Sequence, residues 1–228
     1  MPAARVRVVL GLLVVALSLA GCAGFDNPAA AHGLSRGDLV DELAAQLGGS
    51  ASRTYLATYS LAGGATGTIA QAQRPARAAY RYPGGELLLA GGTTTRCAGR
   101  ICTVTVTGTG RPAGGAFADA HRAGLVDPAA VQDLLNAARI DPDTTVEQHD
   151  TTVAGRHATC LRLGNVDTAE TGSFSTCVTS DGVLGSFAGT IEGTKVDVAL
   201  TNVAGQVPGD AFDTPAGARM TASDPVTP

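Results

Sequence analysis

The stretch Tyr55-Leu56-Ala57-Thr58-Tyr59-Ser60-Leu61 marks the point where the hydrophobic pattern changes from a helical period to a period of two. Its odd-numbered residues are apolar or aromatic, and the residues between them are mostly polar. Side chains of a β-strand point alternately to the two faces of a sheet. The alternation therefore predicts a strand with one buried face.

Runs of the same kind recur along the chain and are separated by turns rich in glycine and proline, such as Pro83-Gly84-Gly85 and Gly91-Gly92. Alternation with one apolar side is typical of antiparallel sheets that are covered on one face. We expect further strands at 76–82, 102–107, 145–153, 156–163, 173–179, 183–191 and 195–203.

A helix is predicted to precede the first strand. Ser35 is a suitable N-cap, and Asp38 three residues later completes a capping-box pattern. The apolar residues then follow the helical period, and Gly48-Gly49 supplies a stop signal.

A second helix is predicted to interrupt the strands. Asp127 is a suitable N-cap, and Pro128 fits the first helical position. Val131, Leu134 and Leu135 form one apolar stripe of this helix.

The order helix, strands, helix, strands predicts an α+β fold, because two helices cannot cover both faces of so many strands. We expect one curved antiparallel β-sheet with the helices packed on its concave face. One domain is expected over residues 33–219, followed by a disordered tail over residues 220–228 that is rich in Pro, Ala and Thr.

The N-terminal segment indicates export. Arg5 and Arg7 precede an apolar run from Val8 to Ala16, and small residues follow, which is the order of a secretory signal peptide. The run is too short to cross about 30 Å of hydrocarbon, which needs about 20 residues. Residues 1–21 are therefore expected to be a signal peptide, and residues 22–32 a tether.

The ending Leu19-Ala20-Gly21-Cys22 matches the lipobox of bacterial lipoprotein precursors. This resemblance implies a diacylglyceryl group on the sulfur of Cys22, cleavage before Cys22, and acylation, for example with palmitate, of the new amino group. Two or more acyl chains form a stable anchor where one does not. The expected location is the extracytoplasmic face of the cell membrane. An ordinary cleaved signal with a chance cysteine is the alternative.

Net charge and composition exclude some partners and favour covalent staples. Without Arg5 and Arg7 the chain has 14 basic residues, 16 less 2, against 20 acidic ones, so no basic footprint for nucleic acid is expected. Tryptophan is absent and glycine is abundant, which predicts a core of small side chains. Such a domain benefits from disulfides.

Four cysteines remain after Cys22, and in an exported chain they predict two disulfides among three connectivities. Cys97 and Cys102 flank a segment of the size of a hairpin loop. Cys160 and Cys177 are equidistant from the centre of the polar segment 164–173, so an antiparallel pair joined there places them opposite each other. We expect Cys97–Cys102 and Cys160–Cys177.

A metal site is the alternative for these cysteines. His157 and Cys160 are three residues apart, but no second pair with metal-ligand spacing supports a tetrahedral site. On a strand, positions 157 and 160 would point to opposite faces. We therefore expect neither a metal nor another cofactor.

The sequence gives little support to an enzyme. Gly33-Leu34-Ser35-Arg36-Gly37 matches Gly-x-Ser-x-Gly, but a nucleophile elbow needs a preceding strand, and Ser35 is explained as a helix cap. Asp141-Pro142-Asp143 is interpreted as a turn rather than a carboxylate pair. His121, Arg122 and the strand arginines 77, 81 and 162 could meet a lipid headgroup, but solvated faces explain them equally well.

Three segments resemble the LolA-like lipoprotein-carrier superfamily, which includes the lipid-binding LppX/LprG-type lipoproteins. They are Val153-Ala154-Gly155-Arg156 leading into Thr159-Cys160-Leu161, then Cys177 followed by Asp181-Gly182-Val183-Leu184, and finally Phe212 to Ala218. With the order of elements, the resemblance covers most of the chain after Cys22.

The resemblance implies a half-barrel whose concave face and helices enclose an apolar cavity for acyl chains. Val131, Leu134 and Leu135 would line that cavity, or would be ordinary core. The expected function is that of a membrane-anchored extracytoplasmic lipoprotein that binds or carries a lipid or other hydrophobic ligand. The alternative is a sensor or scaffold that acts through a protein partner, of which the sequence gives no identity.

Overall fold

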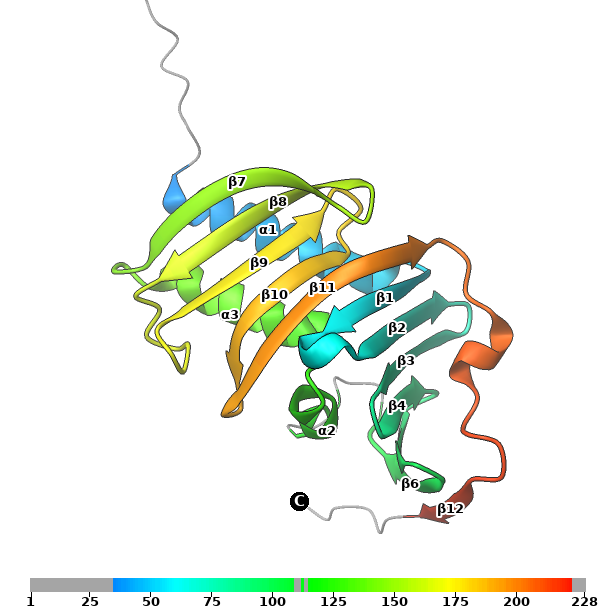
Figure 1. Ribbon diagram of the computed structural model, residues 1–228. Helices are drawn as coiled ribbons and strands as arrows, with labels where there is room; N and C mark the ends of the chain where they lie inside the picture. The colour runs from blue at the N-terminus through cyan, green and yellow to red at the C-terminus, as the bar shows by residue number, and fades with distance from the viewer. Residues whose placement is uncertain (1–34, 109–111, 113–114, 223–228) are drawn as a thin grey trace, which may run out of the picture. The chain divides into compact units, whose positions relative to one another are not determined.

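The computed structural model describes residues 35–108, 112 and 115–222, and these residues belong to one compact unit. Within them, three α-helices and three short 3₁₀ turns accompany the sheet (Figure 1). They are α1 (Arg36–Gly49), η1 (Ser50–Ser52), η2 (Ala62–Gly64), α2 (Ala118–Arg122), α3 (Pro128–Ile140) and η3 (Gly209–Phe212).

All the described strands belong to one sheet of 12 strands in the order β12-β6-β5-β4-β3-β2-β1-β11-β10-β9-β8-β7. Every neighbouring pair is antiparallel except β12 and β6, which are parallel. The strands are β1 (Tyr55–Leu61), β2 (Thr66–Gln73), β3 (Ala76–Tyr82), β4 (Gly85–Ala90), β5 (Thr93–Ala98), β6 (Ile101–Val106), β7 (Thr145–Val153), β8 (Arg156–Gly164), β9 (Ser173–Thr179), β10 (Leu184–Ile191), β11 (Thr194–Ala204) and β12 (Arg219–Ala222).

The sheet is curved and does not close, because its two edge strands, β12 and β7, are not paired with each other. Helices α1 and α3 lie on the concave side, against the half of the sheet formed by β7–β11 and β1 (Figure 1). The expected α+β half-barrel fold is therefore confirmed.

The main core lies between these helices and the sheet face that they cover, which we call the helix-covered face. Strand β1 points its odd-numbered side chains there, and Tyr59 is fully buried. Its hydroxyl donates a hydrogen bond of 3.0 Å to the carbonyl oxygen of Leu184 at the start of β10. This bond ties the first strand of the sheet to its C-terminal half.

Both predicted helices begin at the predicted caps. Ser35 and Asp38 form the reciprocal capping box of α1, and the hydrogen bonds from Ser35 lower the pKa of the Asp38 carboxyl. The Asp127 carboxylate accepts a hydrogen bond of 3.0 Å from the backbone N–H of Ala130 in the first turn of α3.

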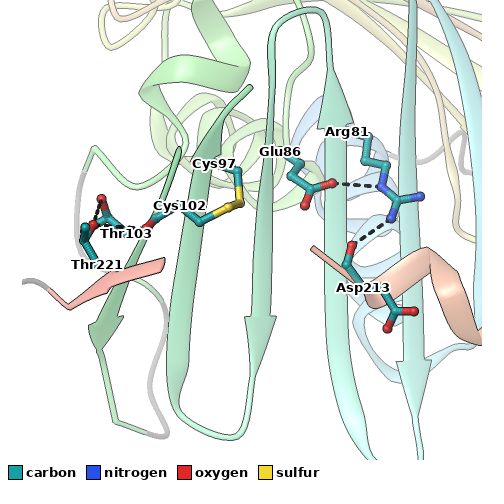
Figure 2. Close-up of a disulfide and its surroundings, with 7 residues drawn as sticks. All are labelled: Arg81, Glu86, Cys97, Cys102, Thr103, Asp213 and Thr221. Atoms are coloured by element: carbon teal, nitrogen blue, oxygen red, sulfur yellow. Dashed lines mark hydrogen bonds and ion pairs between the residues drawn. A yellow bond between two sulfur atoms is a disulfide. The ribbon is translucent and has the colours of Figure 1, made fainter. Parts of the chain in front are cut away.

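A segment between β11 and β12, residues 205–218, packs on the opposite face of β2–β4, and we call it the strap. Val207, Ala211 and Phe212 of the strap pack on a small apolar cluster formed by Ala70, Ala79 and Leu88. Figure 2 shows the polar clamp beside it.

The centre of this clamp is Arg81. Its guanidinium pairs with the Glu86 carboxylate at 3.1 Å and donates to the strap carbonyl oxygens of Asp210 and Asp213 at 3.0 and 3.1 Å. The strap then leads to β12, which extends the sheet beyond β6.

The structure corrects the expected boundary of the C-terminal tail. Residues 220–222 belong to β12 and pair in parallel with Cys102–Val104 of β6. The backbone of β6 offers an unpaired edge there, and the strap brings β12 to it. Residues 223–228 lie outside the described residues.

Besides β12 and the three 3₁₀ turns, four elements of the described structure were not predicted: β2, β4, β5 and the five-residue helix α2. Strand β4 runs Gly-Glu-Leu-Leu-Leu-Ala, without alternation, because both of its faces are covered. Leu87 faces the main core and Leu88 faces the strap. No helix within the described part of the chain is both long and apolar enough to span a bilayer.

Candidate functional site

The proposed lipidation site, Cys22, lies outside the described residues, as do the signal peptide and the tether. Lipidation and membrane attachment therefore stay predictions.

Both predicted cysteine pairings are present in the structure. Cys97 on β5 bonds to Cys102 on β6, and Cys160 on β8 bonds to Cys177 on β9. In each pair the two residues are directly opposite in the antiparallel register. The predicted pairing of Leu163 with Phe174 is found as well, so the β8–β9 hairpin has the expected register.

The α3 stripe proposed to line a cavity lies in and beside the main core. Val131 and Leu135 are fully buried there, and Leu134 is partly buried against it. The hollows described below are lined by other residues.

A hollow with an apolar floor lies beside β3, at the ends of the β2–β3 and β4–β5 hairpins, and we call it the hairpin groove. Its volume is about 810 Å³. The residues that line it are Ala51, Gln71, Ala72, Gln73, Pro75, Ala76, Arg77, Ala78, Tyr80, Leu89, Ala90, Gly91, Gly92, Thr93, Thr94, Thr107, Gly108 and Pro112.

The floor of the hairpin groove is apolar. In the sheet register Ala78 lies opposite Leu89, and both belong to the helix-covered face together with Tyr80. Helices α1 and α3 do not extend over this part of the face (Figure 1). Small side chains in β3 leave the hollow open, and Tyr80 closes one end by an edge-on contact with Phe117, with ring centroids 4.9 Å apart.

The rim of the hairpin groove is polar, and part of it is fixed. The side-chain amide of Gln73 donates hydrogen bonds to the carbonyl oxygens of Ala51 and Arg53, at 2.9 and 2.8 Å. The hydroxyls of Thr94 and Thr107 lie 3.2 Å apart. An apolar floor with a few fixed polar groups is the usual form of a small-molecule site.

A second hollow of about 670 Å³ lies on the opposite face of β7–β11. Most of the residues that line it are polar or charged, among them Glu147, Arg162 and Lys195, although most of the exposed lining surface is apolar, as in the hairpin groove. Because the charges are of both signs, this hollow does not have the single sign of charge that would define a charged ligand.

A buried polar cluster joins α2, α3 and the β10–β11 turn. Both ring nitrogens of His121 face carboxylates that accept hydrogen bonds from an N–H: Nε2 lies 3.0 Å from Asp127 and Nδ1 lies 3.3 Å from Glu192. Burial lowers the pKa of His121, but the hydrogen bonds and charges of the two carboxylates outweigh it, so the net pKa is raised. Since Asp127 also caps α3, the cluster has a structural explanation.

The other residues weighed as catalytic or metal-binding have structural roles. Ser35 caps α1, and the Asp141 carboxylate accepts hydrogen bonds from the backbone N–H groups of Asp143 and Asp167, which lower its pKa. Cys160 is in a disulfide, and the described residues contain no cluster of three metal-ligating side chains.

Sequence reasoning missed the hairpin groove because its walls come from separate elements. The usable signal was the run Ala76, Ala78 and Tyr80, whose small residues lie on the helix-covered face. Nothing in the sequence showed that α1 and α3 would leave that part of the face open.

No family model matches the chain, and no curated protein matches it. Among solved structures, it is similar to an uncharacterised conserved protein from Thermus thermophilus, with 8% identity, a TM-score of 0.49, and coverage of 81% of this chain and 99% of that one. It is also similar to MucB, with 14% identity, a TM-score of 0.44, and coverage of 78% of this chain and 63% of MucB. The chain thus spans less than two thirds of MucB. Likenesses this distant say nothing about function.

Proposed function

We propose that this chain is a membrane-anchored extracytoplasmic lipoprotein that binds or carries a lipid or other hydrophobic ligand in the hairpin groove. The observation that supports the ligand is the groove itself, an apolar floor on the part of the sheet that the long helices leave open. Its volume of about 810 Å³ lies within the range of about 300–1,000 Å³ of small-molecule sites.

The anchor is supported by the N-terminal pattern that ends at Cys22. A tether of 11 residues, 22 through 32, spans at most about 40 Å. The domain would therefore stay close to the bilayer from which a lipid is taken. The proposal assigns no catalytic residue and no cofactor.

The test is mass spectrometry of an organic extract of the purified chain, without residues 1–21 and with Cys22→Ser. We expect a co-purifying lipid at close to one molecule per protein. An Ala78→Leu variant fills the floor of the hairpin groove, and we expect it to lose most of that lipid.

The matched control is Ala188→Leu, which adds the same group at a half-buried alanine on β10, in the hollow on the opposite face. It is expected to retain the lipid. An empty wild-type protein, or equal occupancy in both variants, would reject the proposal and favour a sensor or scaffold that works through a protein partner.

A further inference from the structure

A second, smaller hollow of about 440 Å³ adjoins the hairpin groove and contains two arginines. Its lining residues are Thr54, Ala72, Gln73, Arg74, Arg77, Val207 and Phe212. Ala72, Gln73 and Arg77 also line the hairpin groove, so the two hollows adjoin at the end of the β2–β3 hairpin, the hairpin groove on the helix-covered face and the smaller one on the strap side. We call the smaller one the arginine hollow.

Arg77 differs from the other basic residues that the sequence suggests as contacts of a lipid headgroup. Arg81 is engaged by Glu86 and the strap, Arg122 pairs with Asp119, and His121 lies between two carboxylates. Arg162 is exposed on β8. Arg77 alone among them is partly buried without a carboxylate within 4 Å, as far as the described residues show.

The guanidinium of Arg77 is held in place but lacks acceptors. Its central carbon lies 4.0 Å from the centre of the Phe212 ring, a cation–π contact with the strap. Its Nε is buried and has no hydrogen-bond partner among the described residues. A buried donor without an acceptor is costly and calls for an explanation, and a planar fork of five N–H groups suits a carboxylate or phosphate.

The surroundings of Arg77 favour an anion. Its cross-strand neighbours are Ala72 on β2 and Ala90 on β4, and the arginine hollow has a second cation, Arg74, but no acidic lining residue. The nearest acidic strap residues, Asp210 and Asp213, form no ion pair with Arg74 or Arg77 in the described structure; both give their backbone carbonyls to Arg81. The arginine hollow is therefore locally positive, although the net charge of the whole chain is −4.

We infer that the ligand is an anionic amphiphile, whose apolar chain lies in the hairpin groove and whose carboxylate or phosphate headgroup binds to Arg77, with Arg74 beside it. This inference rests on the proposed function and adds the class of the ligand. Hydrogen bonds from a charged donor to an anion contribute about 1.5–3 kcal/mol, which corresponds to roughly a 10- to 150-fold change in affinity.

The experiment compares four probes by equilibrium titration at fixed ionic strength: a long-chain fatty acid, an alkyl phosphate and a fatty alcohol of the same chain length, and inorganic phosphate. The protein is the chain without residues 1–21 that carries Cys22→Ser, delipidated before use. We expect the two anionic amphiphiles to bind at least 10-fold more tightly than the alcohol.

Three substitutions locate the effect. Arg77→Gln is expected to remove the preference for the anionic probes and to change the affinity for the alcohol by less than about twofold. Arg77→Lys keeps the positive charge but not the planar guanidinium, and we expect it to retain part of the preference for the anionic probes. Arg162→Gln makes the same change in net charge on the other half of the sheet, and we expect it to alter no affinity.

Two outcomes would overturn the inference, and they are distinguishable from a failure of the proposed function. Equal binding of the acid and the alcohol leaves the groove as a lipid site and removes the headgroup site. If no amphiphile binds, the proposed function fails. The titration with inorganic phosphate then shows whether the arginine hollow binds a free anion. Phosphate binding that Arg77→Gln abolishes would then assign the hollow to a free anion, and phosphate binding that is absent or insensitive to Arg77→Gln would reject the site.

Discussion

At the scale of single residues, the His121 cluster gives the fold a defined dependence on pH. His121, Asp127 and Glu192 come from three elements, and both the histidine and Asp127 are buried. The pKa of His121 is raised above its ordinary value of about 6.5. A group with a raised pKa in the folded state stabilises the fold fully below its unfolded pKa, and this contribution is lost as the pH rises through the folded pKa.

The prediction is that His121→Gln lowers the free energy of unfolding by about 1–3 kcal/mol near pH 6 and by less near pH 9. The variant keeps a hydrogen-bonding group for Asp127 but cannot carry the charge. Urea denaturation of both proteins across this pH range measures the difference. A difference that stays constant, or that grows toward high pH, would show that the charge of His121 does not stabilise the cluster.

At the scale of elements, the two disulfides are predicted to contribute unequally. Cys97–Cys102 closes a sequence separation of 5 residues and Cys160–Cys177 one of 17. On the chain-entropy model the shorter loop contributes about 2 kcal/mol and the longer about 3 kcal/mol. Replacing each pair by two alanines should therefore destabilise the domain more at 160 and 177 than at 97 and 102.

Guanidinium denaturation of the two double variants measures this order. The reverse order would mean that the β5–β6 hairpin depends on its disulfide for more than loop closure. We do not expect the reverse order, because pairing with β4 and β12 also holds the two strands of this hairpin in place.

The elements show where sequence reasoning succeeds and where it stops. The β8–β9 hairpin was predictable with its register because a polar loop lies midway between two cysteines and between Leu163 and Phe174. Strand β2, Thr-Gly-Thr-Ile-Ala-Gln-Ala-Gln, has few of the β-branched and aromatic residues that mark strands, and it is held by its neighbours β1 and β3. Strand β12 is exposed at all four positions, so no burial pattern marks it.

The candidate site was less predictable than the fold. The α3 stripe of Val131, Leu134 and Leu135 was a correct helix pattern, but a pattern of burial does not tell core from cavity. The hairpin groove is open because α1 and α3 cover only part of the single 12-stranded sheet (Figure 1). The state of Arg77 depends on Phe212, which is 135 residues away, 212 less 77. Such long-range packing has no local signal.

At the scale of the whole molecule, the question is whether the half of the sheet that carries the groove unfolds together with the half that carries the helices. The groove half joins the helix half through β1, which pairs with β2 on one side and with β11 on the other, and the hydrogen bond from Tyr59 to Leu184 links β1 to β10. One hydrophobic core includes residues of β1, β2, β3 and β4 as well as of α1 and α3. Shared core and continuous pairing predict one cooperative transition.

The chain itself provides two separate reporters for this prediction. It has no tryptophan, and two of its four tyrosines, Tyr80 and Tyr82, lie on β3 in the groove half, while Tyr55 and Tyr59 lie on β1, so part of the near-ultraviolet tyrosine signal reports on the groove half. Far-ultraviolet helical signals come mainly from α1 and α3 on the other half. We expect both signals to change at the same urea concentration, and a ligand at 100 times its Kd to raise the stability seen by both by about 2.7 kcal/mol. A partial loss of the tyrosine signal at lower urea would mean that β2–β6 unfold on their own, and the ligand would then stabilise that part of the signal alone.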